Sequence, residues 1–211
     1  MKKLFFFLSV TALLFSFSKP AGTYPFEKWD AATLEKANTA KDAAGYSDEE
    51  KKVVYYSNLA RLNPDLFAKT YYQKFMDSTK TKETANTRSI KNDLTTKFKP
   101  MEALTIKEDL STEAKDHAED TGKKGNLGHF TGDGKSYDFR MKKFKGVYAN
   151  TAENCDYGNK DALSIVIRQL IDKGHGVEHR NVIMNKSFKY VGVSIQPHKK
   201  EKWTCVMEFA N

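Results

Sequence analysis

Histidines and acidic residues in the second half of the chain are the side chains best suited to do chemistry. The sequence holds five histidines, and four of them lie between residues 117 and 179. His129 follows a glycine-containing loop, Glu153 lies among small and apolar neighbours, and His179 comes after a glycine-rich break. Such imidazoles and carboxylates can hold a divalent metal that keeps positions open for water, or act as general acid and base. Spacing alone is a weak signal, because a lone histidine is more often a hydrogen-bonded structural residue.

The other histidines and one arginine have plainer expected roles. His117 shares a helical stripe with alanines, which predicts a core histidine with one hydrogen-bonded nitrogen. His175 lies four residues before His179 but is flanked by glycines, so we expect it in a loop. His198 sits beside lysines in a predicted turn and is expected to be solvated. Arg140 is expected to hold a helix to the core through a carboxylate.

Composition narrows the class of protein. The chain has 211 residues, of which 39% are hydrophobic and 29% are charged. That mixture excludes a polytopic membrane protein, and the many aromatic residues argue against wholesale disorder. Subtracting 27 acidic from 35 basic residues gives a formal charge of +8, which suits either nucleic acid or another anionic surface.

The N-terminal residues predict an exported protein. A basic start, Met1–Lys3, precedes an apolar run at residues 4–17 that is shorter than the ~20 residues a membrane-spanning helix needs. This pattern is typical of a secretory signal peptide. We assign residues 1–18 to it, with cleavage after Ala21 as the competing position. The expected location is therefore secreted, periplasmic or at the cell envelope, with no transmembrane segment after cleavage and no nucleic-acid partner.

An oxidising compartment would permit a disulfide between the two cysteines, Cys155 and Cys205. Cys205 lies in a strand-like run, and no third cysteine competes with the two. Ser136 and Ser194 lack an obvious activating partner, so a serine or cysteine hydrolase is disfavoured.

The elements that must position these residues are helices first and strands last. Capping signals predict helix starts at Ser47, Asn63, Thr105 and Asn159, and residues 77–88 are predicted to form an exposed loop before a helix at 89–98. Two strand-like runs close the chain, at 190–196 and 202–209. Helices followed by an antiparallel hairpin predict an α+β fold.

Several segments, in order along the chain, resemble motifs of the CAP superfamily, which is also called the SCP domain and includes the cysteine-rich secretory proteins. The matching segments are Leu110–Glu119, Gly128–Phe130 with Asp133, Gly134 and Arg140, Ala152–Asn154, His179–Ile183, Tyr190–Val193 and Val206–Ala210. Two positions depart from the family pattern, because Ala152 and Glu178 stand where glycine is usual. The resemblance covers residues 46–211, which we expect to form the domain, with residues 19–45 as an N-terminal extension.

The resemblance implies an α–β–α sandwich, with a small central antiparallel sheet and a cleft on one side. The family's cleft is lined by two histidines and two acids, which correspond here to His129, Glu153, Asp172 and His179. Asp172 is the matching position for the second acid, and Glu178 is a weaker substitute. The two histidines would bind zinc or another divalent cation, and we expect their rings to face each other across a pocket.

Three classes of function remain open from the sequence. The first is a cleft that binds a metal together with a small-molecule, lipid or peptide ligand. The second is a metal-assisted, peptidase-like hydrolase in which Glu153 acts as the catalytic base on a metal-bound water. The third is an extracellular adhesion or interaction protein. The residues leave open whether any reaction is catalysed.

Overall fold

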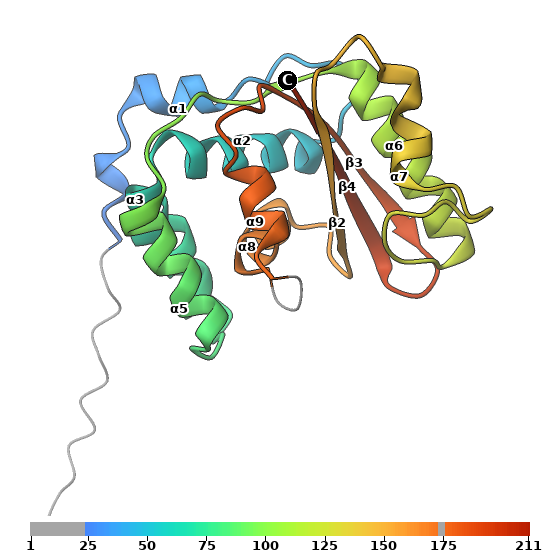
Figure 1. The fold of residues 1–211 in the computed structure, drawn as a ribbon. Coiled ribbons are helices and arrows are strands. Elements are labelled where there is room, and N and C mark those ends of the chain that lie inside the picture. The colour runs from blue at the N-terminus through green and yellow to red at the C-terminus, as the bar shows by residue number, and fades with distance from the viewer. Residues whose placement is uncertain (1–23, 173–175) are drawn as a thin grey trace, which may run out of the picture.

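A four-stranded sheet lies at the centre of the described part of the chain (Figure 1). The structure is a computed structural model that describes residues 24–172 and 176–211, so the expected signal peptide lies outside it. The strands run in the order β1-β3-β4-β2. Their bounds are β1 Thr105–Ile106, β2 Thr151–Tyr157, β3 Tyr190–His198 and β4 Lys202–Ala210. The predicted terminal hairpin is confirmed, and β2 is an edge strand antiparallel to β4.

Helices cover both faces of this sheet, which confirms the predicted α+β sandwich. Helix α6 (Glu108–Lys124) lies along one face, with α7 (Tyr137–Met141) outside it. Helices α2 (Asp48–Leu62), α8 (Ala162–Ile171) and α9 (Glu178–Ile183) lie on the other face. One detail differs from the expectation of a purely antiparallel sheet, because the short strand β1 pairs with β3 in parallel.

The remaining helical segments surround this framework, and most of them lie before β1. Their bounds are η1 Phe26–Lys28, α1 Ala31–Ala37, α3 Pro64–Phe67, η2 Ala68–Tyr72, α4 Gln73–Ser78, α5 Ala85–Asn92, η3 Asp93–Lys97 and η4 Lys142–Phe144. Among residues 24–172 and 176–211, no helix has both the length and the apolar character needed to cross a membrane.

Residues that precede position 46 pack into the same core as the rest of the fold. Trp29 is buried, and its indole N–H donates to Thr70 Oγ1 over 3.1 Å. Asn58, fully buried in α2, donates from Nδ2 to the carbonyls of Ala37 and Leu104 at 3.0 Å each. A buried amide that bridges three segments leaves few unpaired polar groups where they meet.

The helix starts follow the predicted caps at two of four positions. Ser47 forms a full capping box with Glu50, and Asn63 caps the helix that begins at Pro64. The Thr105 cap is wrong, because Thr105 lies in β1 and α6 begins at Glu108 without a side-chain cap. The Asn159 cap is also wrong by two residues, since Asp161 accepts the Ser164 N–H at the start of α8.

The segment between α4 and α5 differs from the expected long loop. Helix α5 begins at Ala85, where a helix was predicted only from residue 89. The reason is a reciprocal cap in which Thr84 and Thr87 each accept the other's backbone N–H. A threonine in place of the usual Glu or Gln completes this box, so the pattern was not visible as a capping signal.

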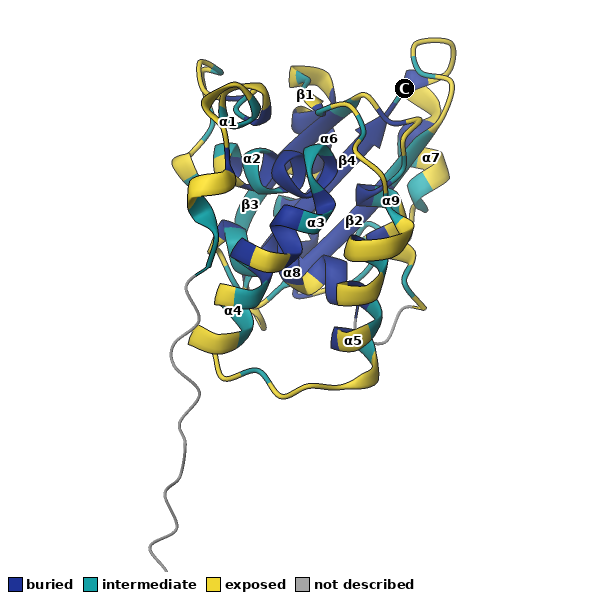
Figure 2. Cartoon of the chain, turned by 90° about the vertical axis from the view of Figure 1, so that its left-hand side faces the viewer, coloured by how far each residue is buried: buried dark blue, intermediate teal, exposed yellow. Residues whose placement is uncertain are grey.

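The strands alternate between two different environments. On the α2 and α8 side, Val191, Val193, Met207 and Phe209 join the main hydrophobic core, which Figure 2 shows as the buried centre of the molecule. On the opposite side α6 lies very close to the sheet. A Cβ at Gly192 would be 2.1 Å from the backbone carbonyl carbon of Leu110, so only glycine permits this approach.

The predicted disulfide between Cys155 and Cys205 is wrong, because both residues are free cysteines. In the β2–β4 register Cys155 pairs with Val206, while Cys205 pairs with Asp156. Neighbouring residues of one strand point to opposite faces, so the two thiols lie on opposite sides of the sheet. Cys155 packs with Ala114 under α6, and Cys205 belongs to the main core.

Candidate functional site

A histidine–carboxylate pair joins the loop after α6 to the edge strand β2. Helix α6 ends at Gly125, which adopts a positive φ of 73°, and the chain then turns toward His129. His129 Nδ1 lies 2.7 Å from Glu153 Oε1. The side chain of His129 is 46% exposed, whereas that of Glu153 is 1% exposed. A buried acid therefore orients a histidine that solvent can reach.

Arg140 of α7 holds three carboxylates beneath this pair. Its guanidinium lies 2.6 Å from Glu153 Oε2, 2.7 Å from Glu113 Oε1 and 3.3 Å from Glu208 Oε1. The expectation that Arg140 holds a helix to the core through a carboxylate is confirmed, with three carboxylates where one was foreseen. Lys143 adds a second cation on Glu113.

The charges of this cluster shift the pKa values of two neighbouring acids, Glu153 and Glu208, in opposite directions. Burial alone would raise the pKa of Glu153, but the hydrogen bond from His129 and the charge of Arg140 lower it to about 2. Burial and the charge of Glu153 raise the pKa of Glu208 well above its usual range. Glu153 is thus the ionised acid and Glu208 the neutral one, which keeps a proton on His129 Nδ1 facing Glu153.

A second histidine–carboxylate pair lies where α8 meets α9. Asp172 ends α8 with a positive φ of 52° and is 2% exposed. Its Oδ1 lies 2.8 Å from His179 Nδ1, and its Oδ2 accepts the backbone N–H of His179 at 2.8 Å. From the edge strand, Asn154 Nδ2 donates to the His179 carbonyl over 3.0 Å. The pair is therefore fixed both to its own helix and to β2.

Both pairs are in contact with the edge strand. Alternation along β2 directs Glu153 and Cys155 toward α6, while Asn154 and Asp156 reach α8 and α9. Cys155 connects the two regions, because its Sγ lies 3.9 Å from His129 Nδ1 and it also lines a cavity beside Asp172. The structure thus brings the four predicted cleft residues to one strand, as two separate hydrogen-bonded pairs.

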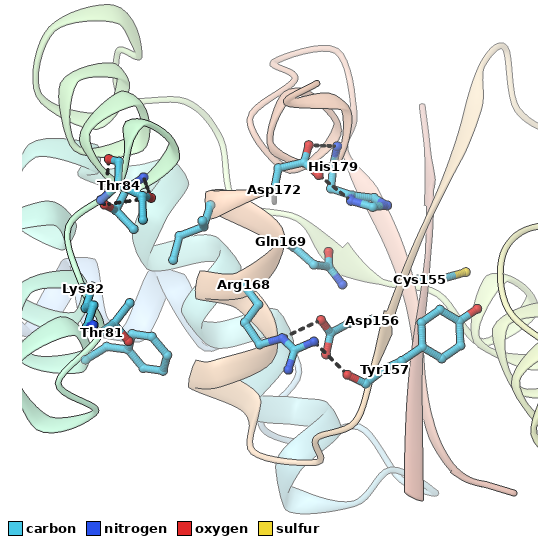
Figure 3. Close-up of a pocket in the computed structure, with 13 residues that line it drawn as sticks. Thr81, Lys82, Thr84, Cys155, Asp156, Tyr157, Arg168, Gln169, Asp172 and His179 are labelled. Atoms are coloured by element: carbon cyan, nitrogen blue, oxygen red, sulfur yellow. Dashed lines mark hydrogen bonds and ion pairs between the residues drawn. The ribbon is translucent and has the colours of Figure 1, made fainter. Parts of the chain in front are cut away.

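The cavity beside the second pair has a volume of about 770 Å³ (Figure 3). Its wall combines apolar and polar side chains from β2, α4, α5, α8, α9 and the loop before α5. The lining residues are Phe75, Thr81, Lys82, Thr84, Thr87, Cys155, Asp156, Tyr157, Arg168, Gln169, Ile171, Asp172 and His179. Clefts of this size and mixed polarity are typical of small-molecule sites.

Asp156 is the unusual carboxyl group of this wall. It is 7% exposed, and Arg168 Nε lies 3.1 Å from its Oδ1 while its Oδ2 has no hydrogen-bond partner among the described residues. Burial raises the pKa of Asp156 to about 7, against the opposing charge of Arg168. Asp156 was not among the predicted site residues. An acidic residue three positions after Glu153, where an apolar residue is usual in a buried strand, was a readable signal.

His117 lies next to the first pair and confirms its expected core role. It is 1% exposed, and Nε2 is 3.0 Å from the Gly128 carbonyl, while Nδ1 has no partner in the described part of the chain. Burial lowers the pKa of His117, so it is neutral. His117, Glu153 and Cys155 offer ligand atoms within 4.8 Å of one another, a grouping the sequence did not suggest because His117 lies far from the other two along the chain.

The prediction for His198 is wrong, because this residue is 3% exposed rather than solvated. Its Nε2 lies 2.8 Å from the Asn126 carbonyl, and its Nδ1 accepts backbone N–H groups from Lys200 and Glu201. The turn folds over the ring, and Tyr157 packs against it edge-on. His175, expected in a loop, lies outside the described residues.

The donor atoms of both pairs fit a divalent metal. In each pair Nδ1 faces a carboxylate, and metal-binding imidazoles usually carry such a partner on the nitrogen that does not bind the ion. Nε2 of His129 and of His179 are therefore the nitrogens suited to coordination. Burial raises the pKa of the Cys155 thiol well above its usual range, so Cys155 is not a ready ligand at neutral pH.

Comparisons with known proteins identify the family. The model of the cysteine-rich secretory protein (CAP) family matches residues 15–207. Among solved structures, an outer surface protein from Borrelia burgdorferi is similar at 19% identity and a TM-score of 0.45, covering 53% of this chain and 79% of that one.

Two further solved structures are similar over about half of this chain. An extracellular protein containing an SCP domain, from Bacillus anthracis, matches at 18% identity and a TM-score of 0.43, covering 53% of this chain and 34% of that one. A cysteine-rich secretory protein from Staphylococcus aureus matches at 18% identity and a TM-score of 0.40, covering 52% and 32%. No curated protein matches the sequence. Because the family match spans most of its length, the chain belongs to the cysteine-rich secretory protein (CAP) family.

Proposed function

We propose that this protein is an exported CAP-domain protein whose cavity binds a small ligand, assisted by a divalent cation at His129 and His179. The observation that carries the proposal is the cavity of about 770 Å³ with the Asp172–His179 pair in its wall. The basic and apolar pattern of residues 1–18 supports export to a secreted or periplasmic location.

The residues of the site have distinct tasks in this proposal. Asp172 fixes the ring of His179 through two hydrogen bonds, and Glu153 does the same for His129 through one. Arg140 keeps Glu153 ionised, so His129 retains its proton on Nδ1 and presents Nε2 outward. A bound divalent cation would polarise an oxygen atom of the ligand. Phe75 and Ile171 supply apolar surface for the rest of the ligand.

Binding is favoured over metal-assisted hydrolysis. A general base works best when its pKa lies near the operating pH, and the pKa of Glu153 is lowered to about 2. Its carboxylate is also occupied on both oxygens, by His129 and by Arg140. Glu153 is therefore suited to orienting an imidazole and poorly suited to accepting a proton from water.

The cavity can be tested with an apolar fluorescent probe, 1-anilinonaphthalene-8-sulfonate, titrated with and without Zn²⁺. Lys82 is exposed at the cavity wall, so Lys82→Trp should obstruct the cavity and weaken probe binding several-fold. Glu83→Trp is the matched control, because the neighbouring Glu83 is exposed but is not a lining residue. Equal probe binding by the two variants would refute the cavity as the binding site.

The cation is tested separately by calorimetric titration of Zn²⁺. His129→Gln and His179→Gln should each weaken zinc binding at least tenfold, since each removes one of the two nitrogen ligands. Phe130→Ala, which changes the exposed residue beside His129, should leave zinc binding unchanged. Zinc affinity that is equal in all three variants would refute the metal part of the proposal and leave the cavity part standing.

A further inference from the structure

The exposed apolar side chains of this protein are concentrated in one segment. Among the described residues, the large hydrophobic side chains that remain exposed are Leu127 (57%), Phe130 (60%), Phe139 (49%) and Val147 (64%). All four fall within residues 122–147, which run from the end of α6 through α7 to the turn before β2. We call these residues, without the site residue His129, the α7 segment. Exposed apolar side chains concentrated in one part of the chain are candidates for an interaction surface.

The same segment carries most of the excess positive charge. Residues 122–147 contain seven Lys or Arg and two Asp or Glu, so their formal charge is 7 − 2, or +5, of the +8 for the whole chain. The Arg140 side chain is buried among its acidic partners, but the lysines of the segment are exposed. The ion pair of Lys135 with Asp133 is between solvent-exposed groups and is therefore weak. Lys143 differs, because it pairs with the buried Glu113.

Lysines and aromatic rings are in direct contact on this surface. Lys135 Nζ lies 5.6 Å and Lys142 Nζ lies 5.1 Å from the centre of the Phe139 ring. Phe139 is half exposed, so the ring and the two ammonium groups are presented together. Lys145 adds a further exposed charge just beyond η4.

The α7 segment lies apart from the cavity. Figure 1 shows α7 beside α6 on one side of the sheet, with α5 and α8 on the other side. The cavity is lined from α8, β2 and the loop before α5, and the lining set includes no residue of the α7 segment. A partner on the α7 segment would therefore leave the cavity open.

We propose that the α7 segment docks this protein on the surface of a bilayer that contains anionic phospholipids. Phenylalanine and leucine side chains gain free energy when they enter the boundary between headgroups and acyl chains, and lysines beside them pair with lipid phosphates. Each lysine near an anionic surface contributes about 1 kcal/mol. A polyanionic polymer would attract the same lysines but would gain little from four exposed apolar side chains. The combination therefore favours a lipid surface, independently of what the cavity binds.

The test is co-sedimentation with phosphatidylcholine vesicles, prepared with and without phosphatidylglycerol. The protein should begin at Lys19, because the apolar run at residues 4–17 could itself enter a bilayer, and the described fold begins only at residue 24. Binding is expected with phosphatidylglycerol and should be at least tenfold weaker without it. Equal binding to both vesicles, or to neither, would overturn the proposal.

Two double variants separate charge from apolar insertion. Lys142→Glu with Lys145→Glu should weaken vesicle binding more than tenfold, because two attractive charges become repulsive. Lys91→Glu with Lys186→Glu makes the same change in net charge at exposed positions outside the segment, and it should have less than a threefold effect. Equal losses in the two variants would mean that only net charge matters and would overturn the proposal.

Phe130→Ser with Phe139→Ser should also weaken vesicle binding, by at least tenfold, while the melting temperature stays near that of the parent because both rings are exposed. Unchanged vesicle binding in this variant would show attraction to polyanions in general and would overturn docking on lipid. Zinc binding should survive in the lysine variant, which distinguishes this surface from the histidine pairs.

Discussion

The two faces of the sheet are stabilised by different kinds of contact, although the same strands form both. On the α8 face, Cys205, Met207 and Phe209 extend a large apolar core. On the α6 face, small apolar clusters around Leu110 and around Ala114 are separated by buried acids. One face thus depends on burial of apolar area, whereas the other depends on Arg140, whose guanidinium contacts acids from several elements.

The difference explains where each histidine–carboxylate pair gets its rigidity. Asp172 lies at the end of α8, which packs into the apolar core. It holds His179 through both the ring and the backbone. Glu153 is fixed by Arg140 across the α6 face, and it holds His129 through the ring alone. The first arrangement should tolerate changes in charge nearby, whereas the second should not.

The largest expected effect is the loss of Arg140. Arg140→Met keeps a long apolar side chain but leaves Glu113, Glu153 and Glu208 without their shared cation. Breaking a buried ion pair by removing one partner typically costs about 3–5 kcal/mol. We expect the free energy of unfolding, measured by urea denaturation, to fall by that amount.

Arg88→Met is the matched control for this change. Arg88 also pairs with a glutamate, Glu83, at 2.9 Å, but its side chain is 61% exposed. Exposed pairs contribute less than about 1 kcal/mol. If the two variants lose equal stability, the buried charges do not stabilise the α6 face.

A smaller, pH-dependent effect is expected at Asp156. Its folded pKa of about 7 lies above the usual 3.8, so between these pH values the folded protein keeps a proton that the unfolded chain releases. Stability must then fall as pH rises through this window. Asp156→Asn removes the titration, so the variant should gain stability relative to the parent between about pH 4 and about pH 7, by at most roughly 4 kcal/mol. Urea denaturation across this range measures the gain.

Asp120→Asn should show the opposite trend. Burial would raise the pKa of Asp120, but hydrogen bonds from the Gly132 N–H and from Lys124 lower it overall. An acid with a lowered folded pKa stabilises the protein at high pH and loses that contribution as pH falls. The Asp120→Asn variant should therefore be less stable than the parent at neutral pH and approach it in acid. Parallel pH profiles for the two variants would contradict both assignments.

Sequence patterns predicted the elements and the identity of the site residues better than their pairings. The Ser47 box and the Asn63 cap depend on neighbours three residues away, so local sequence was sufficient. The contact of Arg140 with three acids depends on how α7, α6 and the sheet are placed in space. Nothing in the spacing of residues 113, 140, 153 and 208 encodes that placement.

Strand register explains the error at Cys155, and backbone hydrogen bonds explain the error at His198. A shift of one residue moves a side chain to the other face of a sheet, so two cysteines on adjacent strands can be neighbours or can be separated by the sheet. Local sequence offers no means of choosing, and the register sets Cys155 opposite Val206. His198 was expected in solvent because lysines follow it, yet the backbone N–H groups of Lys200 and Glu201 donate to its ring.

The smallest expected effect concerns the two free thiols, one on each face of the sheet. Their labelling rates measure the opening of each face separately. Burial raises the pKa of both thiols well above the usual range, so the reactive thiolate is scarce while the protein is folded. Reducing agent should leave the melting temperature unchanged, and denatured protein should titrate two thiols.

Cys155 is 8% exposed at the cavity wall, whereas Cys205 is fully buried in the apolar core. Local opening of the α6 face therefore suffices for Cys155, but Cys205 requires opening of the main core. In single-cysteine variants, Cys205→Ser should be labelled by a thiol reagent faster than Cys155→Ser. A melting temperature that falls on reduction would indicate that the disulfide forms after all. Equal labelling rates would mean that the two faces open together.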